Sequence, residues 1–121
     1  MLEIVFYPGN GQEPCSIDIA SDVLRWLAES DFVEIGADHP TKIHIDGEEA
    51  EIPLVKLGQG NRKRLRDFFR EAISYESDNV LHQLGDSPSK KEVQAVTYKL
   101  KKLLELLKCV ENENYQYLQR V

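Results

Sequence analysis

Several features that define special classes of protein are scarce or missing in these 121 residues. There are two cysteines, Cys15 and Cys109, and they form no C-x-x-C pattern, so the sequence indicates neither a disulfide framework nor a zinc ribbon. The opening residues, MLEIVFYPGN, lack the basic and apolar segments of a secretory signal peptide. We therefore expect a cytoplasmic protein whose thiols are reduced.

Long hydrophobic runs are also missing. The densest apolar stretch, LKKLLELLKCV, is interrupted by charged residues and cannot span a bilayer. Hydrophobic residues make up 41% of the chain and charged residues 30%, which is ordinary for a globular protein of one domain. We expect a single domain over residues 1–121 with no membrane association.

No group of residues matches a known catalytic or metal-binding pattern. The three histidines, His39, His44 and His82, are scattered and form no H-E-x-x-H motif. The GQG sequence at 58–60 lacks the third glycine of a dinucleotide-binding loop. Cys15 has no base beside it in sequence and belongs to an acidic half of the chain, which disfavours a reactive thiolate. We expect no enzymatic activity, no cofactor and no metal site.

Charge is distributed unevenly along a chain whose formal net charge is −6. Residues 1–55 carry twelve acidic and two basic residues, a net charge of −10. Residues 56–121 carry nine acidic and thirteen basic residues, a net charge of +4. Such an asymmetry means either that the two halves complement each other or that each half binds a different partner.

The clearest local signal is a β-hairpin in TKIHIDGEEAEIPL. Asp46-Gly47 is a preferred two-residue turn between extended segments. A turn at this position gives the facing pairs Ile45–Glu48, His44–Glu49, Ile43–Ala50 and Lys42–Glu51. Because side chains alternate between the faces of a strand, Ile43, Ile45, Ala50 and Ile52 then face the core and the charged pairs face solvent. The acids Asp46, Glu48, Glu49 and Glu51 are therefore candidates for binding a partner.

Periodicity predicts the elements around this hairpin. Alternation indicates strands at 2–7, 15–19 and 32–36, and Ser21 is the expected N-cap of a short helix. From 61 to 84 the period is helical, as one helix or as two. The apolar face of this segment consists of Leu65, Phe68, Phe69, Ala72 and Ile73.

A second long helix is expected over residues 89–110. Ser89 and Glu92 form an S-x-x-E capping box at its start. Its apolar seam, in alternating three- and four-residue spacing, consists of Val93, Val96, Leu100, Leu103, Leu107 and Val110. Strands that precede helices in this way predict an α+β fold. A small antiparallel sheet from the N-terminal half, about 1–56, is expected to pack against C-terminal helices over about 61–110.

The tail at 111–121 leaves several interpretations open. If the seam continues, Asn114 occupies a heptad a position, where a single buried asparagine sets the register of a coiled-coil dimer. Leu104 and Leu106 widen the apolar face beyond a zipper seam, so we favour a helix that packs within its own domain. The tail then finishes the helix, frays, or places Tyr115 and Tyr117 at an interface.

The start of the first long helix, which Asn61 is expected to cap, is strongly basic. Its first turns carry Arg62, Lys63, Arg66 and Arg70. Positive charge here opposes the helix dipole, so one hypothesis is that these residues bind an anion or RNA phosphate. The alternative, which we favour, is that they are solvated or paired with acids of the same chain, for which the hairpin offers Glu48, Glu49 and Glu51. An isoelectric point near 5.1 argues against binding to duplex nucleic acid.

These observations favour a non-enzymatic protein-interaction module. An acidic N-terminal half attracts a basic protein and speeds its encounter. Small acidic inhibitors, including immunity proteins that neutralise basic nuclease toxins, share this size and charge but no motif with the chain. The alternatives are an anion- or RNA-binding regulatory domain that uses the basic residues at 62–70, and a homodimeric structural or accessory subunit that pairs through the C-terminal helix.

Overall fold

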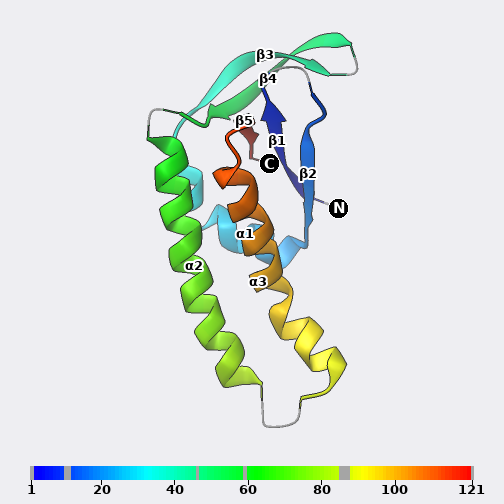
Figure 1. The fold of residues 1–121 in the computed structure, drawn as a ribbon, viewed down its shortest axis with the longest axis vertical. Coiled ribbons are helices and arrows are strands. Elements are labelled where there is room, and N and C mark those ends of the chain that lie inside the picture. The colour runs from blue at the N-terminus through cyan, green and yellow to red at the C-terminus, as the bar shows by residue number, and fades with distance from the viewer. Residues whose placement is uncertain (1, 10–11, 46, 59, 85–87, 121) are drawn as a thin grey trace.

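A computed structural model describes residues 2–9, 12–45, 47–58, 60–84 and 88–120. Its elements are β1 (Leu2–Pro8), β2 (Cys15–Ile19), α1 (Ser21–Ala28), the 3-10 helix η1 (Asp31–Glu34), β3 (Asp38–Ile45), β4 (Glu48–Lys56), α2 (Asn61–Gln83), α3 (Lys90–Glu111) and β5 (Tyr115–Gln119). The helices lie on one face of an antiparallel sheet (Figure 1). The expected α+β fold is confirmed.

The sheet has five described strands in the order β2-β1-β5-β4-β3. In β1, Ile4 and Phe6 point toward the helices, where each is fully buried in the main core. Val5 and Tyr7 point to the opposite face and belong to a second, smaller apolar cluster. Alternation along one strand therefore supplies both cores, and the predicted β1–β2 hairpin is confirmed.

The β3–β4 hairpin has the predicted register. Ile45 pairs with Glu48, Ile43 with Ala50 and Lys42 with Glu51, as the turn chemistry requires. Gly47 has φ +80, a conformation that glycine adopts without strain, whereas Asp46 lies outside the described residues. Ile43 is buried in the second cluster and not beneath the helices, because the hairpin crosses the end of the sheet (Figure 1).

The segment at 32–36 is not the strand that its sequence suggests. Residues Asp31–Glu34 form η1, and the Ser30 hydroxyl accepts a hydrogen bond from the Phe32 amide. Phe32 and Ile35 are buried, while Val33 between them is 43% exposed. A spacing of three between buried residues fits a 3-10 turn, whereas a strand would bury alternate positions.

Two predicted helix caps are wrong by one residue. α1 begins at Ser21 itself, its N-cap is Ala20, and no side chain caps it. α2 begins at Asn61, and its N-cap is Gly60 with φ +89. The side-chain amide of Asn61 instead donates a hydrogen bond to the Lys56 carbonyl at 3.1 Å. This bond connects the start of α2 to the end of β4.

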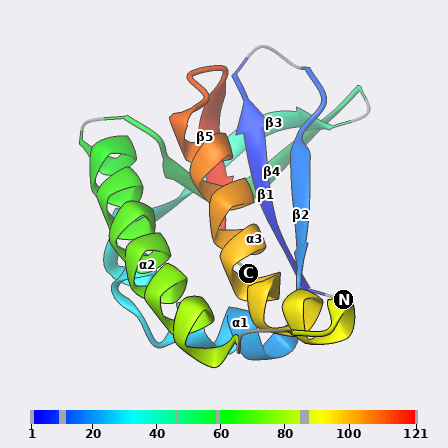
Figure 2. The same cartoon turned by 60° about the horizontal axis from the view of Figure 1, so that its bottom comes forward.

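The two long helices pack side by side and antiparallel (Figure 2). α2 is one continuous helix, which settles the question that its sequence left open, and Leu65 and Phe69 of its predicted stripe are fully buried. At the start of α3 the Ser89 hydroxyl accepts a hydrogen bond from the Glu92 amide at 3.2 Å, as predicted. None of the helices in the described part of the chain has the length and apolar character needed to cross a membrane.

The C-terminal tail is a strand, and it occupies the middle of the sheet. α3 ends at Glu111, and β5 inserts between β1 and β4. Leu118 of β5 is fully buried and lies opposite both Phe6 and Val55. The expectation that the tail extends the helix or frays is therefore wrong. The sequence YQYLQ has no clean apolar–polar alternation, and its strand character depends on partners far away in sequence.

Candidate functional site

The acidic end of the β3–β4 hairpin is the first candidate surface. Its described members are Glu48, Glu49 and Glu51, which we call the hairpin acids, and all three are exposed. Lys42 Nζ lies 3.9 Å from Glu49 Oε1, diagonally across the hairpin. Both side chains are more than half exposed, so this pair leaves the negative charge of the surface accessible to solvent.

Arg62 is partly buried and bonded to the backbone of other elements. It lies in the first turn of α2, and its guanidinium donates hydrogen bonds to the carbonyls of Val110 at 2.6 Å, Asn112 at 3.0 Å and Tyr115 at 2.5 Å. Burial lowers the pKa of Arg62, and the nearby carboxylate of Glu113 opposes that effect. Arg62 thus joins α2 to the end of α3 and the start of β5, and it satisfies carbonyls that a helix end leaves free.

The other three basic candidates lie near two acids of the helices, Asp67 and Glu111. Lys63 Nζ lies 3.4 Å from Asp67 Oδ2, and Arg70 donates to Glu111 Oε2 at 2.8 Å. Arg66 Nε is 4.0 Å from Asp67 Oδ1 and makes no hydrogen bond in the described structure. The four side chains therefore do not converge on one anion. The predicted pairing with acids of the same chain is therefore found for these residues. The described partners are acids of the helices, however, and not the hairpin acids.

The tail residues have structural positions. Asn114 lies in the turn between α3 and β5, where its amide donates to Asn112 Oδ1 at 3.0 Å, so its assignment to a heptad a position is wrong. The Tyr115 ring lies 5.9 Å from the Phe6 ring on the helix-covered face. Tyr117 packs against the second cluster on the other face. Both tyrosines are only partly buried, but their rings contact the protein's own cores.

Arg120 is a second embedded arginine, and sequence analysis missed it. Its guanidinium donates to the carbonyls of Phe32 at 2.6 Å, Ile35 at 2.9 Å and Gly36 at 3.2 Å. Asp38 Oδ1 lies 3.6 Å away, and the Arg120 side chain is 7% exposed. Arg120 stands alone in the sequence after a short segment. Nothing in that pattern indicates that it donates hydrogen bonds to carbonyls in and after a 3-10 helix some 85 residues earlier.

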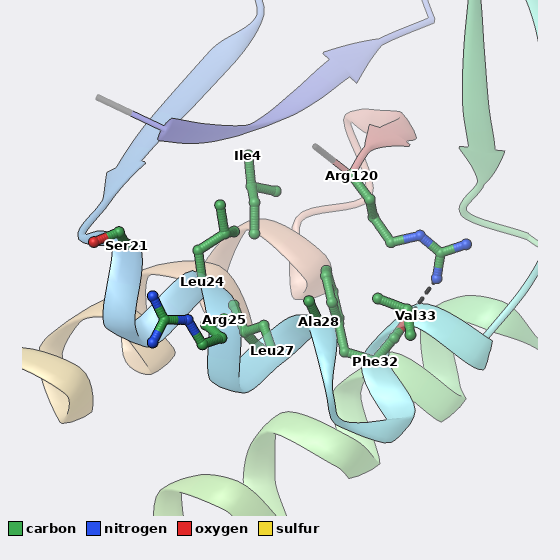
Figure 3. Close-up of a pocket in the computed structure, with 9 residues that line it drawn as sticks. All are labelled: Ile4, Ser21, Leu24, Arg25, Leu27, Ala28, Phe32, Val33 and Arg120. Carbon is green, nitrogen blue, oxygen red and sulfur yellow. Dashed lines mark hydrogen bonds between the residues drawn. The ribbon is translucent and has the colours of Figure 1, made fainter.

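A pocket of about 300 Å³ opens beside α1 and η1 (Figure 3). It is lined by Ile4, Ser21, Leu24, Arg25, Leu27, Ala28, Phe32, Val33 and Arg120. Ser21 and Arg25 lie at one end and Arg120 at the other, where it bonds the Phe32 carbonyl. Among the described residues that line it, none is His, Cys, Asp or Glu, so the pocket supplies no conventional general acid or base.

Within the described ranges, no three His, Cys, Asp or Glu side chains are placed to hold a metal ion. Comparisons of the chain with protein-family models, with curated proteins and with solved structures found no significant match.

Proposed function

We propose that this protein is a non-enzymatic interaction module that binds a basic protein through the hairpin acids. An inhibitor or immunity-type protein that neutralises a basic partner, such as a nuclease toxin, fits this description. The observation that carries the proposal is the separation of the two charged regions. The hairpin acids are exposed, whereas Arg62 bonds carbonyls at the end of α3 and the start of β5. Lys63 and Arg70 pair with acids of α2 and α3.

The position of the hairpin supports a role in recognition. It extends across the end of the sheet, and its tip projects past β1 and β2 (Figures 1 and 2). Its inner side chains, including Ile43 and Leu54, are buried, so the strands have a fixed support. A partner can thus contact the acids while the backbone that carries them stays in place, which limits the entropy lost on binding.

Net charge adds a longer-range contribution. The chain carries −6 overall and −10 over residues 1–55, so a positively charged partner is attracted before contact. This attraction acts mainly on the rate of association, and salt screens it over about 8–10 Å near physiological ionic strength. The pocket near Arg25 offers an apolar recess on another part of the surface, and the proposal does not depend on it.

The two alternatives have less support. An anion- or RNA-binding role needs Arg62 and its neighbours to be available, but Arg62 bonds three carbonyls and Arg70 bonds Glu111. A homodimer through α3 needs a free apolar face, but Leu103, Leu106 and Val110 are fully buried in the protein's own core. Among the described large hydrophobic residues of α3, Leu104 is the one classed as exposed, with 40% of its surface accessible.

The experiment is affinity capture from an extract of the source organism, with identification by mass spectrometry and then measurement of association rates. A variant with Glu48→Lys, Glu49→Lys and Glu51→Lys is compared with the wild type. We expect a basic partner that binds the wild type with a rate falling as salt rises, and that binds the variant at least about tenfold more slowly. Circular dichroism establishes that both proteins are folded.

The matched control reverses three other exposed acids, Glu3, Glu13 and Glu29, and so changes the net charge by the same amount. If only overall charge matters, both variants slow association equally and the assignment to the hairpin is wrong. If association is indifferent to salt and to both sets of reversals, recognition by negative charge is wrong altogether.

A further inference from the structure

The two cysteines meet in the folded protein. Cys15 begins β2, and Cys109 lies in the last turn of α3. Their residue numbers differ by 94. Their sulfur atoms are 3.8 Å apart, and both thiols are free. A disulfide needs a sulfur–sulfur distance of about 2.05 Å. A small rotation of either side chain brings the two sulfur atoms that close. Neither the spacing nor the composition of the sequence shows this contact.

The thiol pair is accessible. Both cysteines are partly exposed and lie at a pocket of about 450 Å³ between β2 and α3. The pocket is lined by Cys15, Ser16, Ile17, Asp18, Lys102, Glu105, Lys108 and Cys109. A small oxidant can therefore reach the sulfur atoms without unfolding of the protein.

The two thiols are not equivalent. Burial, with smaller contributions from the neighbouring Cys15 thiol and the Glu105 carboxylate, raises the pKa of Cys109 to about 12. Tyr115 also contacts the pair: burial and its interaction with Cys15 raise the pKa of its phenol. Cys109 therefore stays protonated at neutral pH and is a poor nucleophile. We assign the first reaction with an oxidant to Cys15, which begins the edge strand β2.

We propose that Cys15 and Cys109 form a reversible intramolecular disulfide, which makes this pocket a redox modification site that responds to hydroperoxides. In the first step the Cys15 sulfur attacks hydrogen peroxide, an S–O bond forms and the O–O bond breaks. The departing hydroxide takes up the Cys15 proton and leaves as the first water. In the second step the Cys109 sulfur attacks Cys15, an S–S bond forms and the S–O bond breaks. The departing hydroxide takes up the Cys109 proton and leaves as the second water. The two thiols lose two electrons, which reduce one peroxide, and a dithiol reductant reverses the change.

The disulfide joins elements that noncovalent contacts alone now hold together. β2 is an edge strand, and it packs against the end of α3 that also carries the carbonyls bound by Arg62. A bond across such a long loop restricts the unfolded chain strongly. The oxidised protein is therefore expected to be more stable than the reduced protein, with the same fold.

The test treats the purified chain with hydrogen peroxide at one equivalent. We expect the intact mass to fall by two hydrogen atoms, peptide mapping to show Cys15 linked to Cys109 within one chain, and the melting temperature to rise by about 10 °C. Dithiothreitol should restore all three properties. Oxygen added to the separate cysteines, or a link between two chains, overturns the proposal.

Single variants establish the order of the steps and guard against a folding artefact. Cys109→Ser keeps Cys15, which should still consume peroxide and then form a mixed disulfide with added glutathione. Cys15→Ser keeps Cys109, which should react with peroxide at about a tenth of the rate of Cys15 in the other variant, or more slowly. Equal rates for the two variants mean that the assigned order is wrong. Circular dichroism and a melting temperature close to that of the reduced wild type show that each variant is folded.

Reversibility is tested in glutathione buffers of graded ratio. A redox site should pass from mostly dithiol to mostly disulfide within the range that such buffers cover. A pair that stays fully reduced or fully oxidised across that range is not a reversible site, and the proposal is then wrong. This outcome is independent of whether the hairpin acids bind a basic protein.

Discussion

The two most strongly charged segments of the chain differ in what their side chains contact. At the tip of the β3–β4 hairpin, Glu48, Glu49 and Glu51 remain in solvent. At the start of α2, Arg62 reaches across to three carbonyls of another helix and strand. Both segments are clusters of like charge in the sequence, but the hairpin acids are exposed, whereas Arg62 of the basic cluster contributes to the fold.

The difference arises from the backbone around each segment. The facing strands β3 and β4 pair with each other along the hairpin, so the hairpin acids are not needed to hold the two strands together. The end of α3 leaves carbonyls without helical partners, and the planar guanidinium of Arg62 has enough donors for all three. Arg62 thus shows that a charged residue in a cluster of like charge serves the fold when the carbonyls of a helix end lie within its reach.

The largest effect is expected from Arg62→Met, which keeps a long side chain and removes the donors. Three carbonyls of the α3–β5 junction then lose their partner, and we expect the free energy of unfolding to fall by about 2–3 kcal/mol. Urea denaturation followed by circular dichroism measures this change.

The matched control for that variant is Arg64→Met, because Arg64 lies in the same helix but is exposed. It should change the free energy of unfolding by less than about 0.5 kcal/mol. Arg62→Lys should recover only part of the lost stability, since an ammonium group cannot present the same planar set of donors. Equal losses for Arg62→Met and Arg64→Met would show that the two arginines are alike and that the comparison fails.

A smaller effect is expected where α2 carries an exposed pair. Arg70 and Glu111 are joined at 2.8 Å, with side chains 56% and 40% exposed. A double-mutant cycle with Arg70→Ala and Glu111→Ala should give a coupling energy of about 0.5 kcal/mol that decreases as salt rises. A coupling energy above about 2 kcal/mol would mean that this pair contributes to the stability of the fold as Arg62 does, and is not a weak surface ion pair.

The smallest effect on stability is expected at the hairpin. Neutralisation by Glu48→Gln, Glu49→Gln and Glu51→Gln removes one exposed pair with Lys42 and leaves the buried side of the hairpin intact. The free energy of unfolding should change by less than about 0.5 kcal/mol, as thermal and urea denaturation can show. A loss above about 1 kcal/mol would mean that these acids serve the fold, and the proposed partner surface would lose its basis.

Local signals in the sequence were sufficient for several parts of the fold. The Asp46-Gly47 pair gave the register of β3 and β4, and the Ser89 cap gave the start of α3. In each case the interacting groups are within a few residues, so turn and cap chemistry decides the outcome. The apolar stripe of α2 was equally clear, because its period of 3.6 depends on the helix alone.

The remaining features depend on contacts between distant residues. Strand β5 was missed because a short polar segment becomes a strand only where β1 and β4 offer free edges. Arg62, Arg120 and the Cys15–Cys109 contact were missed for the same reason, since each joins positions 48 or more apart. The hairpin acids were identified as a candidate surface from sequence, but that they are not covered by α2 was evident only from the structure.

The place of β5 also bears on the order in which the chain is able to fold. The last strand in sequence is the middle strand in space, and it is the described element that pairs with both β1 and β4. A ribosome that has released only the first hundred residues has produced two hairpins whose sheet edges are still unjoined. Closing the contact between Phe6 and Leu118 then requires most of the chain to be brought together at once, which is characteristic of slow, high-contact-order folding.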